Sequence, residues 1–209
     1  LPPIEEIRAT AMPGLYEVRV GPAGIFYTDA QGDFLIQGAM MDTKTRRNLT
    51  EERINALNAI DFSTLPLKDA IVFKSGNGRR KLAVFEDPNC SYCHRLETEL
   101  AKVKNLTVYM FLYPILGPDS TAKSQNIWCA ADRTKAWQDW MLRQKTPAAA
   151  QCDTAAVQRV LEFGRGHRIT GTPTIVFEDG RRVSGAMDAA ALENKLILDG
   201  DKDVIKKFE

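Results

Sequence analysis

A Cys-x-x-Cys pair stands where an apolar strand pattern gives way to a helical pattern, and this junction constrains the fold more than any other feature of the chain. The segment 84–94 reads VFEDPNCSYCH. The apolar run before the pair predicts a buried strand, and Leu96, Leu100 and Val103 predict a helix that begins near Cys90. A strand that leads through a short turn into a helix is typical of α/β folds.

The position of the pair at the start of a helix predicts a reactive dithiol. Unpaired backbone N–H groups and the macrodipole at a helix N-terminus favour a thiolate, so we expect Cys90 to be the nucleophile. Cys93 lies one turn further along, where it can attack a mixed disulfide on Cys90 and release the partner. Ser91 and Tyr92 between the cysteines, and His94 after them, are expected to tune the reduction potential.

Other interpretations of the pair stay open. Half of a zinc site would need a second ligand pair, but Cys129 and Cys152 have no cysteine or histidine beside them. Cys-x-x-Cys-His is also the attachment signature of c-type haem, and His94 completes it, so a haem electron-transfer protein is an alternative. A purely structural disulfide within the pair would stabilise little, because the loop it closes is very short.

A second motif lies downstream, where Gly171-Thr172-Pro173 precedes the apolar run 174–177. Proline is tolerated at the first position of a strand and cis X-Pro bonds occur in tight turns, so Thr172–Pro173 is a candidate cis peptide. Together with the upstream cysteines, the motif predicts a loop in which the Thr172 backbone pairs with a substrate strand. Pro173 would pack beside the sulfur atoms without adding a competing N–H group.

The patterning of the chain predicts two domains, 1–60 and 61–209. Short strands separated by glycine turns are predicted between residues 15 and 41. A linker helix is predicted from about residue 48 to the end of the first domain, with Glu51 and Glu52 in its first turn.

Strands and helices alternate in the second domain, which favours an α/β sheet covered by helices. The apolar runs 70–73 and 81–85 flank the sequence SGNG, which predicts a β-hairpin. A mostly helical stretch follows from about residue 120 to 163, and then a strand pair and a last helix.

These motifs carry a resemblance to known proteins. The segment from about 70 to 198 resembles a thioredoxin fold, with its active site at Cys90 and Cys93 and its cis-proline loop at Thr172-Pro173. The whole chain is similar to the periplasmic disulfide isomerases of the DsbC/DsbG family, which combine a small strand-rich N-terminal module, a linker helix and a Cys-x-Tyr-Cys-His site.

The resemblance implies an α/β thioredoxin fold with a helical insertion, and a homodimer formed by the N-terminal module. It implies thiol-disulfide isomerase or reductase activity on misfolded or mispaired proteins, a membrane electron donor of the DsbD type, and neither a metal nor a cofactor. A DsbG-like chaperone or sulfenic-acid reductase with weak isomerase activity is the alternative within the family.

Such proteins also carry a second cysteine pair in the helical insertion, which implies a structural disulfide between Cys129 and Cys152; two buried free cysteines are the alternative. A disulfide implies an oxidising compartment. The chain begins at Leu1 without an apolar leader, so we expect a soluble periplasmic protein whose signal peptide has been removed. With 28 Lys and Arg against 27 Asp and Glu, nothing argues for a nucleic-acid partner.

Two positions depart from the family pattern. The residues between the cysteines are Ser-Tyr, where Gly-Tyr is expected in DsbC and Pro-Tyr in DsbG proteins. Thioredoxins place a buried acid six positions before the first cysteine, where this chain has Val84. Glu86 faces the same side of the strand by parity, and we interpret it as a solvated strand end, with a proton shuttle as the alternative. His94 is expected on the helix surface.

Overall fold

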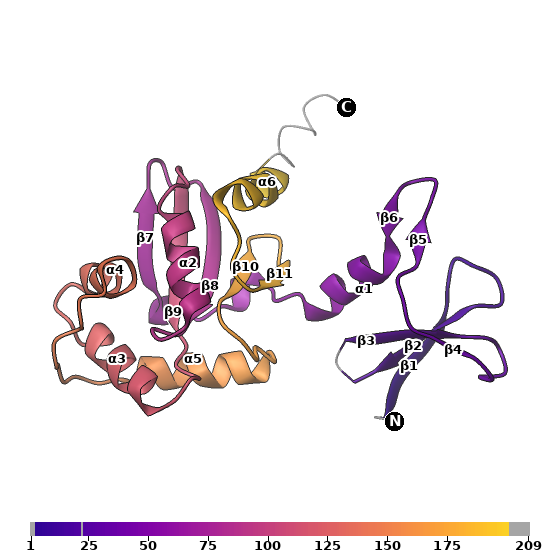
Figure 1. Cartoon of the computed structure of the whole chain (residues 1–209), viewed down its shortest axis with the longest axis horizontal. Helices are drawn as coiled ribbons and strands as arrows, with labels where there is room; N and C mark the ends of the chain where they lie inside the picture. Colours follow the sequence, from indigo (N-terminus) through magenta and orange to yellow (C-terminus); the bar gives the residue numbers. More distant parts are fainter. Residues whose placement is uncertain (1–2, 22, 201–209) are drawn as a thin grey trace. The chain divides into compact units, whose positions relative to one another are not determined.

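Two units make up the chain, Leu1–Ala59 and Ile60–Glu209, and the computed structural model describes residues 3–21 and 23–200 of them (Figure 1). The first unit holds an antiparallel sheet in the order β1-β2-β3-β4. Its strands are β1 (Ile4–Ala9), β2 (Tyr16–Val20), β3 (Gly24–Thr28) and β4 (Leu35–Ile36). The sequence pattern does not predict β1, because nearly all its side chains are exposed and show no buried alternation.

The first unit ends in the short hairpin β5 (Met41–Asp42) and β6 (Arg47–Asn48) and the helix α1 (Leu49–Asn58). The helix begins at Leu49 because the side chain of Asn48 accepts a hydrogen bond from the Glu51 backbone N–H at 3.0 Å. Arg53 attaches the helix to the sheet, since it donates to Glu17 at 3.1 Å and to Glu6 at 2.7 Å.

A five-stranded sheet in the order β11-β10-β8-β9-β7 forms the centre of the second unit. Strands β8 and β9 are parallel and the other neighbours are antiparallel. The strands are β7 (Ile71–Ser75), β8 (Arg80–Glu86), β9 (Leu106–Leu112), β10 (Thr174–Phe177) and β11 (Arg182–Ser184). The helices are α2 (Ser91–Leu100), α3 (Pro118–Trp128), α4 (Arg133–Arg143), α5 (Ala155–Gly166) and α6 (Ala189–Gly200).

Two 3₁₀ turns, η1 (Phe62–Thr64) and η2 (Leu67–Asp69), lead into β7. Alternate residues of the central strands face opposite layers. Leu82 and Val84 of β8 pack with residues of α2 and α6, whereas Phe85 packs with residues of α5. In the described part of the chain, no helix combines the length and the apolar character needed to cross a membrane.

The predicted hairpin of the first two strands in this unit is wrong. β7 and β8 do run antiparallel, but β9 lies between them and pairs with both: Leu106 is opposite Ser75 on one side and Arg80 on the other. The glycine turn reverses the chain, as its sequence indicates, but does not determine which strand becomes the neighbour. Because β9 is buried along almost its whole length, it is more stable in the interior of the sheet than at an edge.

Candidate active site

The two cysteines lie at the N-terminus of α2, just beyond the carboxyl end of the central strand β8. Cys90 is the N-cap residue, and its sulfur accepts a hydrogen bond from the Cys93 backbone N–H at 3.4 Å. Cys90 is 6% exposed and Cys93 is 0% exposed, and both are free thiols. The geometry therefore leaves the first cysteine slightly accessible and seals the second one completely.

The Thr172–Pro173 loop lies against the first cysteine, although 82 residues separate Cys90 from Thr172 in the chain. The Thr172–Pro173 peptide bond is cis, and the Thr172 carbonyl oxygen is 3.2 Å from the Cys90 sulfur. Pro173 precedes β10, which pairs with β8, so the sheet brings the loop to the start of α2. The two sequence motifs thus form one site.

The environments of the two sulfur atoms are opposite. The Cys93 thiol, the Thr172 side chain and the backbone N–H groups of Cys93 and Tyr92 lower the pKa of Cys90 to about 6, against the effect of burial. Burial, followed by Cys90 and the charge of Glu86, raises the pKa of Cys93 far above its ordinary value. At neutral pH this environment therefore favours the thiolate of Cys90 and the protonated thiol of Cys93.

Asp87 holds the loop around the cysteines in place. Its fully buried carboxylate accepts hydrogen bonds from the Asn89 backbone N–H at 2.8 Å and the Ser120 hydroxyl at 2.7 Å. It also accepts from the backbone N–H groups of Ile115 and Leu116 at 2.8 and 2.9 Å. One carboxylate thus joins the loop before α2 to the segment after β9, where the side chains of Ile115 and Leu116 are exposed.

The surface beside Cys90 carries further contact groups. Ser91 and Tyr92 are exposed, and the Tyr92 ring is 60% exposed. Tyr92, Thr172 and Met187 line a shallow groove of about 520 Å³ next to the cysteines. Arg95 and Asp188 also line the groove, so it presents charged as well as apolar groups.

The expectation for His94 is wrong, because its ring is partly buried and clamped between two carbonyl groups. Nδ1 lies 2.8 Å from the Met141 carbonyl oxygen, and Nε2 lies 3.1 Å from that of Pro88. The Trp140 indole N–H donates to the same Pro88 oxygen at 2.5 Å. Neither ring nitrogen is presented as an axial ligand for a haem attached to the cysteines.

Glu86 is also placed differently from the favoured expectation of a solvated strand end. It is 0% exposed, and no described donor lies within hydrogen-bond distance of either carboxyl oxygen. The cause is tertiary: β8 is central, and Glu86 is opposite Leu112 of β9. Glu97 is a further buried acid, 7% exposed, that is not among the residues predicted from the motifs. The signal that could have identified it is an acidic residue within the apolar face of α2.

The remaining two cysteines are joined to each other. The Cys129–Cys152 disulfide has an S–S distance of 2.01 Å and links the end of α3 to the segment that precedes α5. Among the side chains that the structure describes, no group of three or more His, Cys, Asp or Glu is arranged to hold a metal ion.

The pH dependence of Cys90 tests the asymmetry of the pair. Because its pKa is lowered to about 6, the alkylation rate of the reduced protein should rise through a midpoint near pH 6 and fall about tenfold per pH unit well below it. An ordinary cysteine would titrate near pH 8.5. The Cys93→Ala substitution removes the contact that lowers the pKa of Cys90 most, so it should move the alkylation midpoint upward. A wild-type midpoint above pH 8 would contradict the described environment.

Comparison with known proteins gives matches along most of the chain. Residues 1–51 match the family model of the disulfide bond isomerase protein N-terminal domain, and residues 67–197 match that of a thioredoxin-like domain. The chain is 47% identical to the probable thiol:disulfide interchange protein DsbC of Bordetella parapertussis, over 88% of this chain and 65% of that protein. It therefore spans somewhat less than two thirds of that relative's length.

Two further relatives support the same assignment. The thiol:disulfide interchange protein DsbC of Escherichia coli K12 is 32% identical, over 78% of this chain and 69% of that protein. The crystal structure of a disulfide interchange protein from Neisseria gonorrhoeae is 43% identical with a TM-score of 0.60, and the match covers 63% of this chain and 96% of that one. The predicted α/β thioredoxin fold, preceded by a small strand-rich N-terminal module, is confirmed.

Proposed function

Because the chain belongs to the DsbC family of thiol:disulfide interchange proteins, we propose that it rearranges incorrect disulfides in other proteins through Cys90 and Cys93. The observation that carries this proposal is the asymmetric dithiol beside the cis Thr172–Pro173 bond. A slightly accessible thiolate and a fully buried thiol behind it are what an exchange reaction with a large substrate needs.

The chemistry follows from the two environments. The Cys90 thiolate attacks one sulfur of a substrate disulfide, the substrate S–S bond breaks, and the other substrate sulfur leaves as a thiolate. A different substrate thiolate can then attack the mixed disulfide, which rearranges the substrate and returns Cys90 to its reduced form. Alternatively Cys93 attacks Cys90, which reduces the substrate by two electrons and oxidises the protein pair to a disulfide.

The cis-proline loop and the groove are the proposed substrate contacts. The Thr172 backbone lies next to the reacting sulfur, and Pro173 provides no N–H group that would compete for a hydrogen bond. Tyr92 and Met187 supply apolar area in the groove. Contacts to backbone and apolar side chains do not select one sequence, which suits a protein that acts on many misfolded substrates.

The N-terminal unit is the proposed homodimerisation module. Strands β1 and β4 lie at the two edges of their sheet, and large apolar side chains are exposed along them: Ile4, Ile7, Phe34, Leu35 and Ile36. An exposed apolar sheet edge is a template for pairing with another strand. A second copy of the same unit can pair with such an edge and cover its apolar side chains. We therefore expect a dimer in sedimentation equilibrium at micromolar concentration. A monomer under these conditions would contradict the proposal.

An oxidising compartment, the periplasm in this family, is the proposed location. The Cys129–Cys152 bond supports it, because such bonds persist where thiols are not kept reduced. A protein that must attack with a reduced Cys90 in such a compartment needs an external reductant, and the proposed one is a membrane electron donor of the DsbD type.

Repair of a scrambled multi-disulfide protein tests the proposed function. The reduced protein in catalytic amount should restore the activity of the scrambled substrate without net reduction. The DsbG-like alternative predicts weak repair and, in a Cys90→Ala/Cys93→Ala variant, undiminished suppression of aggregation. Absence of repair by the wild-type protein would contradict the isomerase assignment.

A further inference from the structure

Resolution of the mixed disulfide requires a base for Cys93. This thiol is 0% exposed, and its pKa is raised far above the ordinary value by burial and by the neighbouring Cys90 and Glu86. Bulk water therefore does not reach it, and only a group inside the protein can accept its proton before it attacks Cys90.

Glu86 is suited to receive that proton. Its carboxyl group is fully buried at the end of β8, on the strand face of Leu82 and Val84, which packs against the helix α2 that carries Cys93. Neither of its oxygen atoms accepts a hydrogen bond from a described donor, and the Glu97 carboxyl group is the side chain that acts on it most strongly. A carboxyl group with two unoccupied oxygens can take a proton on one oxygen and release a proton from the other.

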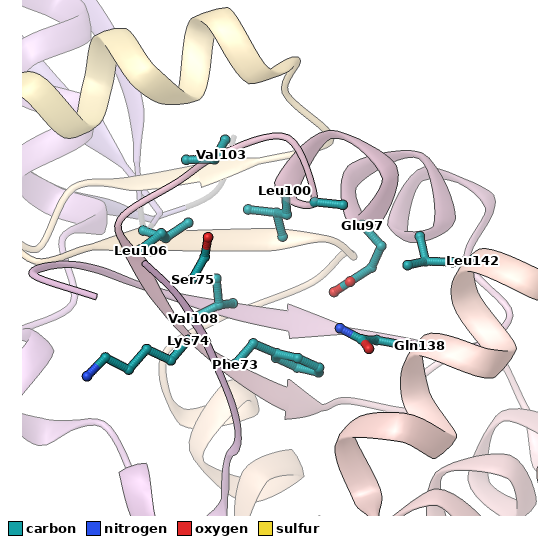
Figure 2. Close-up of a pocket in the computed structure, with 11 residues that line it drawn as sticks. Phe73, Lys74, Ser75, Glu97, Leu100, Val103, Leu106, Val108, Gln138 and Leu142 are labelled. Carbon is teal, nitrogen blue, oxygen red and sulfur yellow. The ribbon is translucent and has the colours of Figure 1, made fainter. Parts of the chain in front are cut away.

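Glu97 continues from Glu86 towards solvent. It lies one turn after Cys93 on α2, and one of its buried oxygens also lacks a partner in the described ranges. Glu97 lines a half-open cavity of about 240 Å³ between α2, α4 and the strands β7 and β9. In Figure 2 its carboxyl group points into this cavity towards the Gln138 amide, with Phe73 and Val108 on the strand side.

We propose that Glu86 and Glu97 form a proton relay that takes the thiol proton of Cys93 and delivers it to water in this cavity. Cys93 gives its proton to Glu86, and Glu86 passes its own proton to Glu97. The Cys93 thiolate attacks the Cys90 sulfur, the Cys90–Cys93 bond forms, and the bond to the substrate breaks with its electron pair on the substrate sulfur. The protein pair is oxidised and the substrate reduced, and Glu97 releases the proton to cavity water.

The electrostatics agree with a pair that shares one proton. Burial, and then the charge of Glu97, raises the pKa of Glu86 well above its ordinary value. Burial also raises the pKa of Glu97, while Glu86, the Trp137 indole of α4 and the His94 charge act to lower it. Two buried carboxyl groups in contact cannot both ionise, so the pair shares one proton and keeps one place that can accept another.

Other charged groups around the relay are few in the described residues. Cys90 and His94 belong to the same helix end, and α4 presents the uncharged Trp137 and Gln138. Lys74 of β7 lines the cavity, but its ammonium group points away from Glu97 in Figure 2. The cavity side of Glu97 is therefore free to exchange a proton with water.

The inference rests on the proposed exchange activity, and a single-turnover experiment separates the two. A mixed disulfide between Cys90 and a small aromatic thiol is formed, and the rate at which Cys93 releases the thiol is followed from pH 5 to 9. We expect Glu97→Gln and Glu86→Gln to slow release at least about tenfold at neutral pH and to make its rate rise only at higher pH. Glu97→Asp should recover part of the rate.

The controls exclude a general structural effect. Glu162→Gln, an exposed carboxylate on α5, should release the thiol at the wild-type rate. The pH midpoint of Cys90 alkylation should stay within about half a unit in all variants that fold, as judged by circular dichroism. Wild-type release rates and pH profiles in both glutamine variants would overturn the relay. Failure of the wild-type protein to form or resolve the mixed disulfide would instead contradict the proposed function.

Discussion

Replacing Cys90 by serine is expected to reduce the repair of a scrambled multi-disulfide protein to the uncatalysed rate. The reaction depends on a thiolate, and the site lowers the pKa of Cys90 to about 6, so about nine tenths of the reduced protein is ionised at pH 7. A serine hydroxyl at the same place stays protonated and cannot form a disulfide. Loss of a catalytic nucleophile costs several powers of ten in rate.

The matched variant is Cys93→Ser, which keeps the nucleophile but removes the buried resolving thiol. It should retain isomerisation, because a substrate thiolate can still attack the mixed disulfide, and it should lose the ability to reduce the substrate. Trapped mixed disulfides on gels without reductant measure this difference. A Cys90→Ser variant that still repairs the substrate would refute the mechanism, whatever the behaviour of the second variant.

Removing the second disulfide should have the largest effect on stability. A Cys129→Ala/Cys152→Ala variant should lose about 3 kcal/mol of unfolding free energy, because a crosslink across 23 residues restricts the unfolded chain. Denaturant unfolding in a Cys90→Ser/Cys93→Ser background measures this loss without a contribution from the redox state of the active pair.

Two controls accompany the measurement. Strong reductant should lower the stability of the protein that contains Cys129 and Cys152 to that of the double alanine variant, and should leave the variant unchanged. The alkylation midpoint of Cys90, measured with the active pair intact, should not move. A loss under about 1 kcal/mol would show that the bond is not a main source of stability.

Several features of the site follow from local sequence. The helix that begins after Cys90 and the turn at Thr172-Pro173 are each encoded by neighbouring residues, because capping, periodicity and proline geometry act over a few positions. These patterns predict an α/β sheet covered by helices, while the thioredoxin fold is implied by the resemblance that the motifs carry and is confirmed by the family matches. The roles assigned to Cys90, Cys93 and the cis-proline loop remain predictions that the experiments above test.

Other features depend on residues that are distant in the chain. The insertion of β9 between β7 and β8, the clamping of His94 by the Pro88 and Met141 carbonyls, and the burial of Glu86 have no local signal.

The sequence by itself determined that this chain carries a dithiol at a helix start and a proline loop that precedes a strand, because short-range geometry specifies both. Only the tertiary structure decided that the loop touches Cys90, that Cys93 is sealed from water, that Glu86 and Glu97 are buried, and that Glu97 lines a cavity. The physical reason is that burial depends on how strands and helices pack. The pKa of a thiol or a carboxyl group follows from that packing, which no short segment encodes.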